Sequence, residues 1–360
     1  MIKLCDTVDY VNVKTLTGNK LIVGDRGSNS YVMIKPSERN VFYKFLEEIK
    51  TKNISTINDL SADCRNIAEG LKKRGYLNDV TESNKSFNEY EALGRKLFEK
   101  DISPENAVEN TNIFRNILYF ALFALIAILD VMFMKRTDLV IDIHAPSVLE
   151  WVLISVTCFP LVIGLHEAGH YLLSRITGIP PSKLIIGFFV IYPTVYISYS
   201  GINLSRTINR ISIISGGVFA HLLSAFAGMM LLREFGDSTF LKVFVLGNIS
   251  MVTANLLPLG ASDGYFLITS LLGIYDLRLK GYKAINSWMH FKKNDFSVNI
   301  FGIIVLALWV LSFWGLHQTM DMLGGNIGIA MHITNIIFIA SATFMFLRFL
   351  IKVYRMKFKV

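Results

Sequence analysis

Cysteine is scarce in this chain, and the few cysteines are far apart. Cys5, Cys64 and Cys158 are the only ones among 360 residues. Three scattered cysteines suit neither a disulfide framework nor a thiolate metal site. We therefore expect reduced thiols that are buried or incidental.

The N-terminal third lacks both a targeting signal and an excess of charge. No basic segment leads into a short apolar core, so a cleavable signal peptide is not expected. Residues 1–112 hold 17 Lys/Arg and 17 Asp/Glu, which cancel. Because binding to phosphates needs a basic footprint, nucleic acid is not expected as a partner.

Apolar residues, in contrast, are abundant and are concentrated after residue 112. Hydrophobic types make up 52% of the chain, more than an ordinary soluble domain carries. Runs of about 20 apolar residues predict membrane spans. Six runs qualify: residues 113–133, 148–173, 211–232, 240–257, 300–317 and 327–350. The fourth carries Asn248 and Asn255, so it is expected to face protein or water.

The distribution of positive charge predicts the orientation of these spans. The formal net charge of +8 arises wholly after residue 112. With the N-terminus in the cytoplasm, 15 Lys/Arg flank the cytoplasmic ends of the spans and 4 flank the outer ends. We expect an integral protein of a bacterial cell membrane with both termini cytoplasmic. Residues 351–360 form a basic tail at the anionic lipid surface.

The segment from Lys183 to Ser200 differs from the spans around it. It is rich in Ile, Val, Phe, Tyr and Thr and is interrupted by Pro193, which predicts a membrane-associated β-hairpin. Such backbone needs protein or a water-filled cavity beside it at membrane depth. A seventh span is the alternative if this segment crosses the bilayer, which would place the basic tail outside.

The second span contains the run His166-Glu167-Ala168-Gly169-His170. Residues four apart share one face of a helix, so both imidazoles can reach one metal ion. Glu167 then lies where a general base for the attacking water is needed. This is the HExxH pattern of zinc hydrolases. Because ionisable groups inside a span are costly, a functional role is favoured.

A third ligand is expected from the end of the fourth span. Two histidines leave a catalytic zinc site one protein ligand short of three. A second polar run, from Asn255 to Gly264, ends at the same cytoplasmic depth as the histidines. Pro258 and Gly260 interrupt the helix, which lets the carboxylate of Asp263 turn toward them.

The two motifs together, HEAGH and N-x-x-P-x-x-x-x-D-G about ninety residues later, resemble the site-2 protease family of intramembrane zinc metalloproteases. The resemblance covers about residues 113–350. It implies one zinc ion per chain, bound by His166, His170 and Asp263, with Glu167 catalytic. It also implies the lipid bilayer as surroundings and a peptide or a transmembrane helix as substrate.

Three further polar residues need an interpretation. The family often has Gly-Pro-x-x-Asn in the third span, where this chain has the run Gly217 to His221, without the proline and with histidine in place of asparagine. His221 therefore either lines the site or packs between helices. Asn255 is a second tentative site-lining residue. Asp130, near the outer end of the first span, is expected to be an interfacial carboxylate.

Residues 1–80 predict a small α+β domain. Two strands are expected at residues 20–24 and 30–35, and two helices follow, the first capped by Ser37 and running to Ile49, the second ending at Gly75. Apolar residues at helical spacing mark their inner faces: Val41, Phe42, Phe45, Leu46 and Ile49, then Cys64, Ile67, Ala68 and Leu71. The order resembles winged-helix, PqqD-like peptide-recognition domains, which implies a leader peptide as partner. Residues 81–112 are expected to form a helical connector.

The sequence thus predicts an α-helical polytopic membrane protein of about six spans with a winged-helix-like N-terminal domain. Its function is expected to be zinc-dependent endoproteolysis, in which the N-terminal domain delivers a precursor of a ribosomally made peptide. One alternative is a signalling protease that releases a membrane-anchored regulator. Another, outside the enzymes, is a transporter or immunity protein with a degenerate site. If the substrate is a helix, it must unwind, and the hairpin can hold it extended by strand addition.

Overall fold

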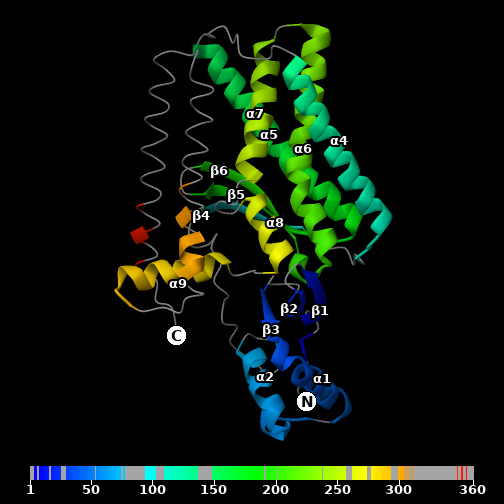
Figure 1. Cartoon of the computed structure of the whole chain (residues 1–360), viewed down its shortest axis with the longest axis vertical. Coiled ribbons are helices and arrows are strands. Elements are labelled where there is room, and N and C mark those ends of the chain that lie inside the picture. Colours follow the sequence, from blue (N-terminus) through cyan, green and yellow to red (C-terminus); the bar gives the residue numbers. More distant parts are fainter. Residues whose placement is uncertain are drawn as a thin grey trace. The chain divides into compact units, whose positions relative to one another are not determined.

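The structure is a computed structural model of the chain. It consists mostly of helices, together with two small sheets (Figure 1). It describes residues 4–5, 8–15, 18–25, 30–52, 54–73, 76–77, 94–102, 109–136, 148–189, 192–199, 201–236, 238–256, 262–273, 277–292, 299–304, 306–307, 310, 347, 350–351 and 354. The described residues fall into two compact units. The first comprises Met1–Asn116, His170–Ile213 and Leu271–Gly273, and the second comprises Ile117–Gly169, Ile214–Ser270 and Ile274–Val360.

The N-terminal part of the first unit begins with an antiparallel meander. Strands β1 (Val8–Thr15), β2 (Gly18–Asp25) and β3 (Ser30–Ile34) lie in that order in the sheet. Two of them, β2 and β3, confirm the strands expected from the sequence. The strand β1 was not expected, because its alternation of apolar and polar residues changes phase where Tyr10 and Val11 adjoin.

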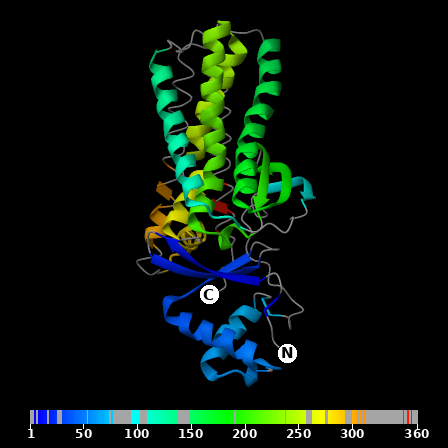
Figure 2. The same cartoon turned by 90° about the vertical axis from the view of Figure 1, so that its right-hand side faces the viewer.

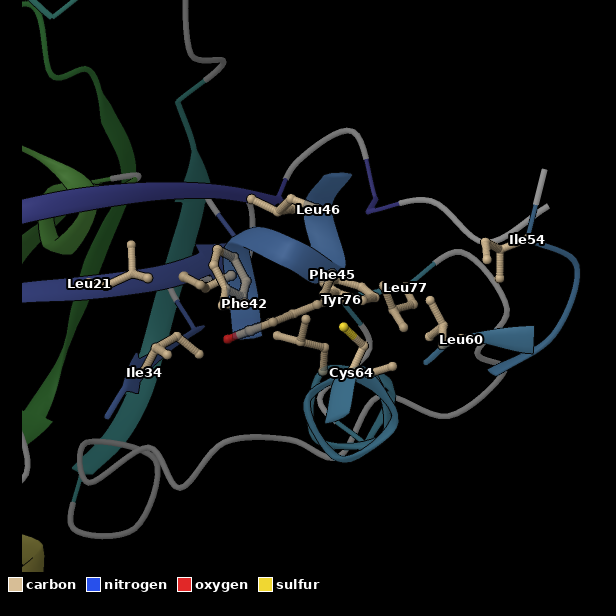
Figure 3. Packing of buried hydrophobic residues seen from close by; sticks show 13 residues of the cluster. Leu21, Ile34, Phe42, Phe45, Leu46, Ile54, Leu60, Cys64, Tyr76 and Leu77 are labelled. Carbon is tan, nitrogen blue, oxygen red and sulfur yellow. The ribbon is translucent and has the colours of Figure 1, made fainter. Parts of the chain in front are cut away.

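Two helices follow the meander and complete its core. Helices α1 (Arg39–Thr51) and α2 (Ala62–Lys72) bury the apolar faces that their spacing predicted. Figure 3 shows Phe42 and Phe45 gathered with Cys64 and Tyr76 in this core. The result is a small α+β domain, and its identification as a winged helix stays a prediction.

The expected cap of the first helix is wrong. Ser37 lies inside a 3-10 turn, η1 (Pro36–Glu38), and the residue at the N-cap of α1 is Glu38, whose side chain makes no capping hydrogen bond. Proline at the start of the turn fixes the backbone there, so the tight turn precedes the regular helix. Helix α2 ends at Lys72, and the expected end at Gly75 lies outside the described residues.

Four helices in the described part of the chain are long and apolar enough to cross a membrane. They are α4 (Ile113–Arg136), α5 (Val148–Thr177), α6 (Thr207–Phe235) and α7 (Thr239–Leu256). Figures 1 and 2 show them running side by side. They confirm a long apolar helix at each of the first four predicted spans. The fifth and sixth lie mostly outside the described residues, so the count of six stays a prediction.

The second sheet contains the expected hairpin and one unexpected strand. Its antiparallel strands are β4 (Gly94–Asp101), β5 (Pro181–Phe189) and β6 (Tyr192–Tyr199), in that order. Strands β5 and β6 confirm the hairpin predicted between Lys183 and Ser200. Because Pro181 pairs with Tyr199, the segment returns to where it began, and it is not a seventh span.

The strand β4 corrects the expectation of a helical connector at residues 81–112. Its sequence, GRKLFEKD, is rich in Arg, Lys and Glu, which favour helix, so local propensity points away from a strand. Hydrogen bonding to the neighbouring strand β5 stabilises the strand conformation, which the local sequence does not favour. The two strands are aligned from Gly94↔Phe189 to Asp101↔Lys183, and Lys183 Nζ lies 2.6 Å from Glu99 Oε1.

Polar side chains tie together the helix ends that belong to the first unit. Arg115, at the start of α4, donates to the carbonyl oxygen of Ile176 at the end of α5, at 2.8 Å. Buried Asn116 donates to Asn209 Oδ1 near the start of α6, at 3.2 Å. The beginnings of α4 and α6 therefore adjoin the end of α5, as expected for successive crossings in alternating directions.

Candidate metal centre

Helix α5 carries both histidines of the HEAGH run, one turn apart. The side chains are largely enclosed, because His166 is 9% exposed and His170 is 8% exposed. Glu167, between them in sequence, is half-buried. Asp263 is the first residue of helix α8 (Asp263–Leu272) and is 8% exposed. Two buried imidazoles and a buried carboxylate thus come from two elements far apart in sequence.

These three side chains meet in a geometry that fits a metal ion. One possible ligand atom from each of His166, His170 and Asp263 lies within 4.8 Å of the others. His166 Nε2 and Asp263 Oδ2 are 3.6 Å apart. Ligands at about 2.0–2.1 Å from a tetrahedral zinc are separated by roughly 3.4 Å. The separation therefore suits two ligands of one ion, and the structure brings together the three residues that the sequence put forward.

The other ring nitrogen of each histidine has a protein partner. His170 Nδ1 lies 2.7 Å from the carbonyl oxygen of Ile213, which can only accept, so Nδ1 carries the proton. His166 Nδ1 lies 3.0 Å from His221 Nε2. In each ring, Nε2 is therefore the nitrogen that can bind a metal. Histidine ligands typically hold their second nitrogen in this way, which fixes the ring and its tautomer.

His221 and Asn248 form a second layer behind the histidines. Both are fully buried, and His221 Nδ1 lies 2.9 Å from Asn248 Oδ1. The interpretation of His221 is thereby sharpened, since it contacts His166 rather than joining the group of possible ligands. Asn248 was not predicted to take part, although a buried asparagine in an apolar helix was the available signal.

The other residues of the second motif have a structural place. Asn255 Nδ2 donates to the carbonyl oxygen of Met251, one turn earlier in its own helix, at 3.0 Å. Its expected place as a site-lining residue stays a prediction. Pro258 and Gly260 lie outside the described residues.

Glycines allow the backbones around the site to approach closely. A Cβ at Gly169 would collide with the carbonyl oxygen of Gly216 on α6 and come within 2.8 Å of Ala220 Cβ. A Cβ at Gly264 would collide with the carbonyl oxygen of Leu256 at the end of α7. Small residues at such crossings are how membrane helices pack tightly. Both glycines belong to the motifs, so the motifs encode packing as well as chemistry.

Asp130, which the sequence places near the outer end of the first span, is more deeply enclosed than an interfacial carboxylate would need to be, and its membrane depth stays a prediction. It is 4% exposed, and both carboxylate oxygens are buried without a hydrogen-bond partner in the described part of the chain. It lies on the face of α4 that packs on α6, one turn before Phe133, whose ring meets Phe226 at 5.4 Å. The carboxylate is therefore enclosed by protein in the described part of the chain.

Neither a protein-family model nor a curated protein matches the chain.

Proposed function

We propose that the protein is an intramembrane zinc metalloendopeptidase that cuts a membrane-associated peptide or helix. The observation that carries the proposal is the meeting of His166, His170 and Asp263 within 4.8 Å, next to Glu167, among helices of membrane length. Two imidazoles and one carboxylate are the ligand set of hydrolytic zinc sites that keep a position open for water or substrate. When bound, zinc supplies Lewis-acid chemistry: it polarises a peptide carbonyl and activates water.

The residues of the chain then divide the remaining work. The carboxylate of Glu167 takes a proton from the water that attacks the scissile carbonyl carbon. It passes this proton to the amine nitrogen that leaves. Glu167 adjoins His166 in the same helix turn. Reacting atoms that are positioned by His166, His170 and Asp263 are therefore kept beside Glu167.

The sheet supports a way to present the substrate. A peptide bond inside a helix is shielded by the hydrogen bonds of that helix, so the substrate has to become extended before it is cut. Strand β5 is paired on both sides, which leaves β4 and β6 as the outer strands. We propose that an extended substrate segment joins an outer strand by main-chain hydrogen bonds.

The N-terminal α+β domain suits the capture of a peptide before cleavage. Residues 1–112 carry no net charge, which is compatible with a peptide partner and not with a nucleic acid. The substrate that we propose first is a leader-bearing precursor, which this domain delivers to the site. Orientation with both termini in the cytoplasm, where such a precursor is made, belongs to the same proposal.

Metal analysis of the purified full-length protein tests the proposal. We expect about one zinc per chain, retained in Glu167→Gln and lost in His166→Ala and Asp263→Asn. Cleavage of a transmembrane model peptide in proteoliposomes should fall about 10²–10⁴-fold in Glu167→Gln, the contribution typical of a general base. A chelator should abolish cleavage and added zinc should restore it.

Two results contradict the proposal. Wild-type protein without zinc would remove the metal centre and favour the transporter or immunity-protein alternative. Wild-type cleavage rates in a zinc-loaded Glu167→Gln variant would remove the catalytic role of Glu167.

A further inference from the structure

A chain of buried hydrogen bonds connects helix α7 to one of the proposed zinc ligands. It starts at the carbonyl oxygen of Phe244, which accepts from Asn248 Nδ2 at 2.8 Å. Asn248 Oδ1 lies 2.9 Å from His221 Nδ1, and His221 Nε2 lies 3.0 Å from His166 Nδ1. His221 and Asn248 are both 0% exposed. Three apolar helices, α5, α6 and α7, thus each contribute one polar side chain to a single line.

The direction of every proton in this chain follows from its first member. The carbonyl of Phe244 has no hydrogen to give, so the amide nitrogen of Asn248 faces it and the amide oxygen faces His221. That oxygen can only accept, so His221 Nδ1 carries a proton. In the neutral ring, His221 Nε2 is then an acceptor, and His166 Nδ1 must donate to it. His166 is left with a lone pair on Nε2, on the side of Asp263.

We propose that His221 and Asn248 are positioning residues that hold His166 in the one tautomer and ring orientation able to bind the metal. This inference rests on the proposed function, because it concerns a ligand of the proposed zinc site. It also excludes His221 as a ligand, since both of its ring nitrogens are engaged. The ring centroids of His166 and His221 are 4.9 Å apart and the ring planes are tilted by 32°, and the two nitrogens meet at 3.0 Å.

Burial makes this arrangement selective. A histidine in water exchanges between tautomers and rotamers, whereas a buried donor without an acceptor carries a large penalty. The wrong tautomer of His166 would point two lone pairs, its own and that of His221, at each other. Partners behind histidine ligands typically change metal affinity by 10–100-fold when removed.

Four variants of the full-length protein test the role. His221→Leu and Asn248→Leu remove the chain, and we expect zinc affinity, measured by competition with a chromogenic chelator, to fall 10–100-fold. His221→Gln keeps one acceptor toward His166 and one donor toward Asn248, so affinity should return to within a few-fold of wild type. Thr253→Val is the matched control, since Thr253 is an exposed residue of α7 whose hydroxyl, among the described residues, donates to the carbonyl oxygen of Ile249 in its own helix.

Cobalt substitution separates positioning from direct binding. With Co²⁺ in the site, we expect His221→Gln to keep the wild-type absorption spectrum, because the ligands are unchanged. Loss of the metal from His221→Gln, as in His166→Ala, would make His221 a ligand and overturn the proposal. Wild-type affinity in both His221→Leu and Asn248→Leu would overturn it as well.

A measurement on metal-free protein keeps this inference distinct from the proposed function. Solid-state NMR of protein with ¹³C,¹⁵N-labelled histidine reports the tautomer of each ring, and only seven histidines contribute. We expect the Nδ1–H form for His166 and His221. If the wild-type protein binds no zinc, the proposed function fails. The tautomers measured in the metal-free protein still decide whether the hydrogen-bond chain exists. Nδ1–H on both rings supports the chain, and Nε2–H on either ring overturns it.

Discussion

At the scale of single residues, the side chains that meet at the site differ in how well the sequence predicted them. His166 and His170 follow from helical periodicity alone, and Asp263 follows from its expected membrane depth. The partnership of His221 with Asn248 does not follow, because it joins two helices whose rotation about their axes is set by packing. A sequence pattern predicts which side chains share one face of a single helix or strand. Contacts between side chains of different elements can be assigned only from the folded structure.

Asp130 shows the cost of a buried charge at this scale. Its carboxylate is 4% exposed and without a hydrogen-bond partner among the described residues. An apolar side chain of similar size avoids that penalty. We expect Asp130→Leu to raise the free energy of unfolding in detergent by about 1–3 kcal/mol.

Zinc content should be unchanged in Asp130→Leu, since Asp130 is not among the possible metal ligands of the described residues. Asp130→Asn, which keeps a polar group in the same place, is the control and should gain less stability. A loss of stability or of zinc in Asp130→Leu would show that the carboxylate is required.

Glu48 gives the N-terminal domain a dependence on pH. The backbone N–H of Ser61 donates to the Glu48 carboxylate at 3.1 Å, and this hydrogen bond holds the pKa of Glu48 below its ordinary value of 4.5. A lowered pKa in the folded state stabilises the fold above the unfolded pKa, and the stabilisation is lost as pH falls through the folded pKa.

We therefore expect Glu48→Gln to loosen the junction of α1 and α2 at pH 7 by about 1 kcal/mol. Amide exchange there should be about fivefold faster than in wild type, measured on the full-length protein by mass spectrometry. The difference between the two proteins should close below pH 4.5. Glu47→Gln, at an exposed neighbouring position, should match wild type at every pH. Equal protection of Glu48→Gln and wild type at pH 7 would refute the assignment.

At the scale of elements, the length of the apolar runs predicted the four long helices and the residue composition predicted the hairpin, whereas two strands were missed. A long apolar run can be recognised from the local sequence, because a membrane helix satisfies its own backbone hydrogen bonds. The strand β4 depends on a partner that follows two helices in the sequence, and the alternation in β1 changes phase where Tyr10 and Val11 adjoin. Strand formation in both cases is decided by pairing, which the local sequence does not contain.

The crossing of α5 and α6 offers a test of packing between elements. Gly169→Ala places a methyl group against the backbone of Gly216, so the helices must separate. We expect a loss of about 1–3 kcal/mol of stability and weaker zinc binding. Gly164→Ala, on the same helix, is the control because a Cβ there meets nothing within 4 Å.

Unfolding in detergent, followed by circular dichroism, provides the comparison. Gly164→Ala should be neutral or slightly stabilising, as alanine is the better helix former. Equal stability of Gly169→Ala and Gly164→Ala would mean that the two backbones are not in contact.

At the scale of the whole molecule, the second sheet constrains how the chain crosses the bilayer. Strand β4 comes before α4 and β5 comes after α5, yet the two strands pair along their length. If each helix crosses once, both strands lie on the same side. Positive charge led to the same arrangement from the sequence, by a physically separate route. Which side this is, and the fifth and sixth spans, stay predictions.

The pairing of β4 with β5 also imposes an order on biogenesis. The ribosome releases β4 before α4, and its partner only after α5 has been made. Until then β4 is a strand without its neighbour, whose exposed edge favours association with other chains. Closure of the sheet joins segments distant in sequence and is therefore a slow step. The pairing therefore joins the segment before α4 to the segment after α5 only when translation has passed residue 189.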